Sequence, residues 1–233
     1  MSQNSLYKKA LSVSQSTPNS AIILEFGLTK MKFKVMKKKL VKYQRIKNMD
    51  EERMVKKVIP EAEKLGEKNI FTKTEIIMEE LGINSIEVTK MNKKQWEQVI
   101  DKKIKEKADE EARKDCYMKE KTRMIANEER ELKKYIWEQL KKNGRTIFEV
   151  RTNMIKIGAN FGQKGKRCEL CRKEETTEHI FKCCWSQDHI QPKMYKDIMV
   201  TINEKTKEEI REIAEAIRKT LKEREQLKEI LKR

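Results

Sequence analysis

The chain has 233 residues, of which 55 are Lys or Arg and 38 are Asp or Glu, so its formal net charge at pH 7 is +17. Apolar residues make up only 37%, with 7 Gly and 3 Pro, and this scarcity of turn residues argues against a β-sandwich or barrel. No apolar stretch is long enough to span a membrane, and the polar start does not resemble a signal peptide. Such an excess of positive charge is typical of proteins that bind a polyanion.

Residues 1–20 are rich in Ser, Asn and Gln, which predicts a disordered N-terminal segment. A helix is expected from Thr29 to Lys47, because apolar residues recur there at helical spacing. No acid interrupts its basic residues, so this run can pair with the phosphates of a nucleic acid and release counterions. The candidate nucleic-acid-binding residues in this run are Lys30, Lys32, Lys34, Lys37, Lys38, Lys39, Lys42 and Arg45.

Two helices are predicted next in the chain. The first opens with acids, can kink at Pro60 and ends at Gly66. The second starts at Thr72, which has the spacing of a capping box with Glu75, and ends before Gly82.

Three more helices are predicted between residues 92 and 157. Asn92 and Gln95 repeat the capping pattern before a long helix that extends to about Lys121. The second half of this helix is almost wholly polar, which indicates a solvated helix held by Glu–Lys pairs. The other two are expected over residues 128–142, ended by Gly144, and over residues 145–157.

Cysteine and histidine gather in the segment CELCRKEETTEHIFKCCW. Two residues separate Cys168 from Cys171, which is the knuckle spacing that lets two thiolates reach one metal ion. His179 follows on a short helix that either Thr176 or Thr177 can cap. These residues are the start of a predicted metal site.

The fourth ligand is either Cys183 or Cys184, and helical geometry slightly favours Cys183 because it lies one turn after His179. Three thiolates and one imidazole select Zn²⁺ and leave no open position, so the predicted site is structural rather than catalytic. Such a site contributes about 10–16 kcal/mol of apparent binding free energy. His189 is expected at the surface, and Cys116 is expected to be an ordinary thiol.

Around the cysteine cluster the chain is basic and, just before it, rich in glycine, which predicts a loop. Further candidate nucleic-acid-binding residues here are Arg151, Lys164, Lys166 and Arg167, with Phe161 and Trp185 able to stack on unpaired bases. The last helix is expected from Lys205 to Arg233. Its apolar residues form a partial heptad that Arg224 breaks, so they support a coiled coil only weakly.

The segment FEVRTNMIKIGANFGQKGKRCELCRKEETTEHIFKCCW resembles the C-terminal part of non-LTR (LINE-type) retrotransposon reverse transcriptases. In that family a short helix with an Arg-Thr pair precedes a loop, a Cys-x2-Cys pair, an acidic stretch and a Glu-His followed by a final Cys. The upstream segment ILEFGLTKMKFKVMKKKLVKYQRIKNMDEERMVKKVI is similar to the region that follows the family's polymerase core. The positions that match around the cluster are Arg151, Thr152, Cys168, Cys171, Thr176, Glu178 and His179.

The resemblance implies a piece of such a polyprotein beyond its polymerase core, with thumb-like helices and a zinc module. The family's polymerase centre needs adjacent aspartates, and this chain has no Asp-Asp pair. We therefore expect it to be no enzyme by itself. The expected fold is mainly α, an irregular multi-helix assembly with a small zinc-stabilised knuckle and a long C-terminal helix. Its expected parts are a disordered N-terminus (1–20), a helical, thumb-like region (21–157), a zinc knuckle (158–190) and a C-terminal helix (191–233).

These expectations describe a non-catalytic segment that binds RNA or DNA beside a polymerase core, without a membrane or a small-molecule substrate. The expected location is intracellular, in a cytoplasmic ribonucleoprotein or in the nucleus. The basic run would also suit a helix at a membrane surface, but zinc knuckles more often accompany nucleic acid. Two alternatives are a helical protein-interaction module whose zinc site only staples loops, and a decayed retroelement fragment without a present role.

Overall fold

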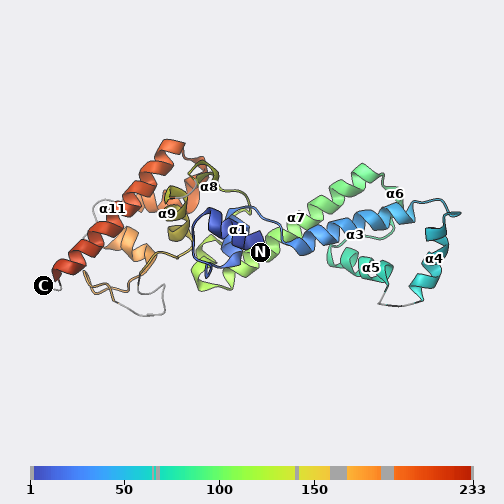
Figure 1. Ribbon diagram of the computed structural model, residues 1–233, viewed down its shortest axis with the longest axis horizontal. Helices are drawn as coiled ribbons and strands as arrows, with labels where there is room; N and C mark the ends of the chain where they lie inside the picture. Colours follow the sequence, from blue (N-terminus) through green and yellow to red (C-terminus); the bar gives the residue numbers. More distant parts are fainter. Residues whose placement is uncertain are drawn as a thin grey trace. The chain divides into compact units, whose positions relative to one another are not determined.

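The computed structural model describes residues 3–64, 66, 69–139, 142–157, 167–184 and 192–231 (Figure 1). These residues form helices, and the only β pairing within the described ranges consists of isolated bridges. The predicted mainly α fold with a long C-terminal helix is confirmed. The chain forms two compact units, which we name the middle unit, Thr29–Glu111, and the terminal unit, Met1–Leu28 with Ala112–Arg233. The sequence predicted instead one helical region over residues 21–157.

The middle unit is built on two long helices, α3 (Met31–Lys47) and α7 (Lys93–Tyr117), the second of which continues into the terminal unit. Its core forms where Phe33, Leu40 and Trp96 bury their side chains. The indole Nε1 of Trp96 donates to the Leu40 carbonyl at 3.1 Å, which satisfies its polar atom inside the core. The smaller helices of this unit are α4 (Met54–Glu63), α5 (Ile70–Glu80) and α6 (Glu87–Lys90).

Two predicted capping patterns have different outcomes. At the start of α7, the Gln95 amide donates to Asn92 Oδ1 at 2.9 Å and the Asn92 amide donates to Gln95 Oε1 at 3.1 Å, so that capping box is confirmed. In α5 the predicted cap at Thr72 is wrong. Asn69 is the N-cap, because its Oδ1 accepts from the Thr72 amide at 2.8 Å and the helix starts at Ile70.

The terminal unit combines both ends of the chain. The predicted disorder of residues 1–20 does not hold over the described part of that segment, where α1 (Gln3–Ala10) forms. Leu11 and Val13 are buried, and the ring of Tyr7 lies 5.0 Å from that of Phe26. These apolar residues order the segment because α2 (Asn19–Glu25) offers them a core.

The other elements of the terminal unit follow Ala112 in the chain, and the longest is α11, which closes the chain (Figure 1). A helix predicted over residues 128–142 is much shorter than expected. Gly144 lies inside the next helix instead of ending the previous one, and a Cβ there would meet the Gln139 carbonyl oxygen at 2.7 Å. Only glycine allows this close approach. The elements are η2 (Glu120–Ile125), α8 (Lys134–Glu138), α9 (Lys142–Arg151), η4 (His179–Cys183), α10 (Pro192–Lys196), η5 (Asp197–Thr201), η6 (Ile202–Glu204) and α11 (Lys207–Leu231).

A buried ion pair lies at the centre of the terminal unit. Arg151 and Glu25 both have fully buried side chains, and Arg151 Nη2 lies 3.0 Å from Glu25 Oε1. The same guanidinium contacts Glu128, and Tyr135 donates its hydroxyl to Glu25 at 2.5 Å. Burial lowers the pKa of Arg151, but the neighbouring Glu25 outweighs it and keeps the group charged. Arg151 is therefore a structural residue, and its prediction as a nucleic-acid contact is wrong.

Candidate metal centre and cationic face

Four side chains of the terminal unit converge on one point. One donor atom each from Cys168, Cys171, His179 and Cys184 lies within 4.8 Å of the others. Cys171 Sγ is 3.1 Å from His179 Nε2, and the sulfurs of Cys168 and Cys184 are 3.9 Å apart. Three thiols and one imidazole are the donor set of a closed, tetrahedral zinc site. The residues therefore fit a metal ion of this kind.

The first two ligands are held by a tight turn. The Cys168 amide donates to the Lys173 carbonyl at 2.7 Å, and the Arg172 amide donates back to the Cys168 carbonyl at 2.8 Å. Arg172 adopts the left-handed conformation, with φ at 64°, which lets the chain reverse. An antiparallel bridge between Arg167 and Glu174 closes this turn. The knuckle therefore comes from local backbone geometry around the Cys-x2-Cys pair.

The other two ligands come from the short helix η4 and the residue after it. Thr176 Oγ1 accepts from the His179 amide at 3.0 Å, so Thr176 is the capping residue of the pair that the sequence suggested. The Cys184 amide donates to the His179 carbonyl at 2.9 Å, across five residues, which is a π-helical turn. In a regular α-helix the residue one turn after His179 is the fourth one along, Cys183. The wider π-helical turn puts Cys184, the fifth residue along, in that place. Cys184 thus joins the cluster, while the Cys183 side chain lies outside the described part of the chain.

The cluster is largely shielded from water and faces a cation. Cys168, His179 and Cys184 are buried, and Cys171 is half-buried. Burial raises the pKa of Cys168, but hydrogen bonds from His179 and Arg224 and from nearby backbone amides outweigh it and lower the pKa to about 6. Thiolate is the form that ligates metal, so this environment prepares Cys168 for that role.

Arg224 is the site residue that sequence reasoning missed. It extends from α11, and its Nη2 and Nη1 atoms lie 3.4 and 3.5 Å from Cys168 Sγ. The same guanidinium contacts the buried carboxylate of Glu175. The signal was present as the charged residue at an apolar heptad position, which we interpreted as a broken coiled-coil pattern. Cys116 lies away from this cluster, and burial raises the pKa of its thiol as expected for a core cysteine.

The predicted basic run on α3 is partly neutralised by α7. Lys30 and Lys32 both pair with Glu111, the former at 2.5 Å, and Lys37 pairs with Asp101 at 2.5 Å. The basic run contains no acid in its sequence, but in the folded structure acids of α7 lie against it. Lys39 is half-buried.

Four exposed cations of α3 take no part in these pairs. Lys34, Lys38, Lys42 and Arg45 are spaced by four, four and three residues, so they share one face of the helix. The ion pairs among the described residues leave all four without an acidic partner. We name these residues the cationic face. Of the candidates near the cysteine cluster, Arg167 is exposed, whereas Lys164, Lys166, Phe161, Trp185 and His189 lie outside the described residues.

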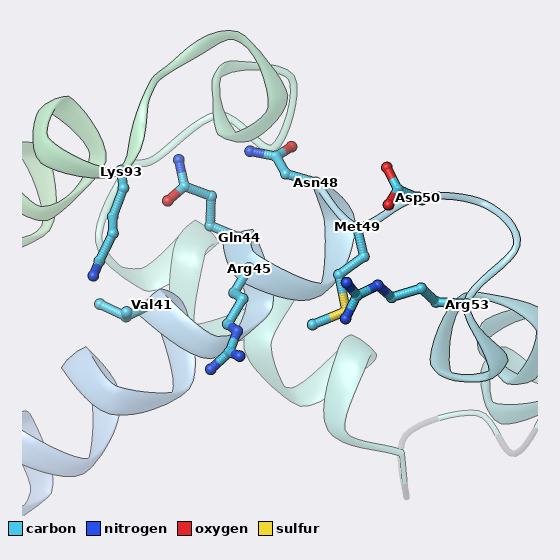
Figure 2. Close-up of a pocket in the computed structure, with 8 residues that line it drawn as sticks. All are labelled: Val41, Gln44, Arg45, Asn48, Met49, Asp50, Arg53 and Lys93. Atoms are coloured by element: carbon cyan, nitrogen blue, oxygen red, sulfur yellow. The ribbon is translucent and has the colours of Figure 1, made fainter.

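A polar hollow of about 550 Å³ adjoins one end of the cationic face. Figure 2 shows Arg45 of α3 between Lys93, at the start of α7, and Arg53, which precedes α4. Asp50 also lines the hollow and contributes its one acidic side chain among the described lining residues. The hollow thus offers several cations to an anion that lies against α3. Its remaining lining residues are Val41, Gln44, Asn48 and Met49.

Within the described part of the chain, no helix has both the length and the apolar character needed to cross a membrane. Comparisons with family models, with curated proteins and with solved structures found no match for this chain.

Proposed function

We propose that the protein is a non-catalytic nucleic-acid-binding module, with a structural zinc ion that stabilises its C-terminal part. The observation that carries the proposal is the cationic face of α3, where Lys34, Lys38, Lys42 and Arg45 are exposed and have no acidic partner among the described residues. A solvated helix surface normally mixes both signs of charge, as the outer side of α7 does with its Lys–Glu pairs. A row of positive side chains on one face of an ordered helix is the electrostatic pattern that suits a phosphate backbone.

The size of this face fits an extended polyanion. From Lys34 to Arg45 the helix rises about 16 Å at about 1.5 Å per residue. One strand of a duplex presents a phosphate about every 3.4 Å along its axis, so several phosphates fall within that length. The hollow beside Arg45 adds Arg53 and Lys93 at the end of the row, which extends the set of cations that can meet phosphates. We therefore infer binding through the backbone, with steep salt dependence.

The zinc part of the proposal follows from the donor set. Three thiolates and one imidazole leave a tetrahedral ion no open position, so the metal would hold the knuckle together and would activate no water. The small knuckle has few apolar residues of its own, and metal binding would supply the free energy that orders it. No catalytic step is assigned to this chain.

The cationic face is tested with one variant that combines four substitutions, Lys34→Gln, Lys38→Gln, Lys42→Gln and Arg45→Gln. Loss of the phosphate contacts is expected to weaken binding of a single-stranded RNA at least about tenfold at low salt. The measurement is fluorescence anisotropy with the full chain.

A matched control removes the same charge from α7, at the exposed lysines Lys94, Lys102, Lys105 and Lys107. If net charge alone drives binding, both variants lose affinity equally, and the cationic face has no special role. Equal zinc content in both variants shows that the terminal unit is unchanged.

The origin of the module is part of the same proposal. The residues that match non-LTR retrotransposon reverse transcriptases include Cys168, Cys171 and His179, and these are three of the four clustered donors. We propose that the chain is the C-terminal segment of such a protein, acting in a ribonucleoprotein or in the nucleus. The DNA upstream of the reading frame tests this: an in-frame polymerase core supports it, and its absence favours a decayed fragment.

A second candidate function is protein interaction, which an apolar groove of the middle unit favours. The groove encloses about 560 Å³, and Met54, Val55 and Val58 of α4 leave 75%, 48% and 52% of their surfaces exposed in it or beside it. Lys42 and Arg45 lie on its rim and none of its described lining residues is acidic, so its partner would be an amphipathic helix with acidic residues. Binding to that partner would depend less steeply on salt than RNA binding and would be lost when Met54, Val55 and Val58 are replaced by polar residues.

A further inference from the structure

Arg224 is one of the most deeply buried charged residues of the terminal unit, with 1% of its surface exposed. Besides its two contacts with Cys168, its Nη1 lies 3.9 Å from the sulfur of Cys184. Its Nη2 contacts Glu175, whose carboxylate also lies 3.4 Å from Nζ of Lys228. One side chain of α11 thus touches two candidate metal ligands and one buried acid.

A bound metal ion would fix the negative charge that faces Arg224 at this place. A zinc ion with three thiolates and a neutral imidazole carries a single negative charge. Together with the Glu175 carboxylate it opposes the two cations Arg224 and Lys228. Lys228 also lies 3.0 Å from the exposed carboxylate of Glu225, whereas the buried Arg224 has polar contacts only with the two sulfurs and Glu175 among the described residues. A buried cation without its counter-charge is costly.

The two halves of α11 are held in the terminal unit in different ways. Its first half packs through Ile210, Ile213 and Ile217, which are buried and apolar. Beyond Thr220 the only fully buried side chain described is Arg224, while Ile230 and Leu231 are 65% and 64% exposed. Leu221 still packs against the core, and after it the described buried contacts of the helix are those of Arg224 with the cluster and Glu175.

We infer that Arg224 is a positioning residue that couples metal binding to the docking of the second half of α11. Metal loading holds residues 221–231 against the knuckle, and by thermodynamic reciprocity the docked helix tightens the metal site. This inference rests on the zinc centre of the proposed function and is independent of the nucleic-acid part. Hydrogen bonds from outer groups to metal ligands commonly change metal affinity by about 10–100-fold.

The experiment uses the full chain, metal-free and with one equivalent of Zn²⁺, as wild type and as Arg224→Met. Chelator competition is expected to show about 10–100-fold weaker zinc binding in the variant. Hydrogen exchange is expected to show that zinc slows exchange over residues 221–231 in the wild type but not in the variant. Residues 207–217 are expected to change little. The control is Arg211→Met on the same helix, where Arg211 is exposed and pairs only with Glu215 among the described residues.

Zinc affinity within twofold of the control, with unchanged protection of residues 221–231, would overturn the inference while leaving the zinc centre intact. A wild type that binds no zinc would overturn both. Far-UV circular dichroism of the metal-free proteins checks that Arg224→Met folds. If it does not, Arg224→Lys replaces it, and wild-type affinity and protection in that variant would equally reject the coupling, since a lysine cannot donate to both sulfurs and Glu175 together.

Discussion

Cys184 enters the cluster because the backbone closes a five-residue turn at His179, with the Cys184 amide donating to the His179 carbonyl at 2.9 Å. The adjacent Cys183 and Cys184 are chemically identical, and spacing arguments assume an α-helical turn of about 3.6 residues per turn. The sequence therefore predicted the ligand types and three of the four positions now clustered, but it left the last one open. A wide helical turn is a local choice that residue spacing does not reveal.

This difference between neighbouring cysteines gives the first residue-scale prediction. Cys184→Ser is expected to lose zinc, or to bind it at least about tenfold more weakly, because serine cannot replace a thiolate ligand. Cys183→Ser, which makes the same chemical change one residue earlier, is expected to keep one zinc per chain. Metal analysis of the purified proteins checks both, and a Cys183→Ser protein without zinc would contradict this assignment.

Arg151 and Arg224 show what the sequence could not tell at this scale. The apolar heptad position of Arg224 was a local sign of burial, whereas Arg151 carried no such sign. Their partners Glu25 and Glu175 lie 126 and 49 residues away along the chain. Burial of a charged side chain depends on such distant partners, so Arg151 resembled a surface residue and Arg224 resembled a break in a coiled-coil pattern.

At the scale of elements, helix existence was easier to predict than helix ends. The segment before α5 holds two residues that favour the N-cap, Asn69 and Thr72. The structure uses Asn69, because the earlier start puts Phe71, Thr74 and Met78 on one buried face. A capping pattern alone does not include this packing, and so the sequence placed the start one turn too late.

The cap of α5 gives a prediction at the element scale. Asn69→Ala is expected to lower the free energy of unfolding by about 1 kcal/mol, because the Thr72 amide loses its acceptor. Thr72→Ala, which removes the cap that the sequence suggested, is expected to cost less than about 0.5 kcal/mol. Urea unfolding of both variants measures the difference, and a larger loss in Thr72→Ala would contradict the structure.

The neutralised part of α3 illustrates the same limit for charge. The basic run has no acid within it, but Glu111 pairs with Lys30 and Lys32 from 81 and 79 residues away. We expected α7 to balance its own charges. Its acidic residues instead form ion pairs with lysines of the basic run. The remaining cationic face is smaller than the sequence suggested, yet it is confined to one side of one helix.

At the scale of the whole molecule, the sequence predicted a disordered start, one helical region and a separate C-terminal helix. The structure joins the start of the chain to its C-terminal part in one unit, because Leu11, Ile22 and Leu24 pack in the same core as Ile210 and Ile217. Pairing of chain ends is a long-range property that helical periodicity cannot report. The net charge of +17 is likewise a whole-chain number, and its placement decides what it can bind.

The most direct test of the account is the salt dependence of single-stranded RNA binding by the full, zinc-loaded chain. Four phosphate contacts at about 0.7 each predict that log Kd rises with log salt concentration with a slope of about 2.8. Fluorescence anisotropy between about 50 and 300 mM KCl measures this slope over a range where the effect is large. A slope near 2.8 is the predicted result. A slope near zero, or no binding at the lowest salt, would contradict the nucleic-acid function.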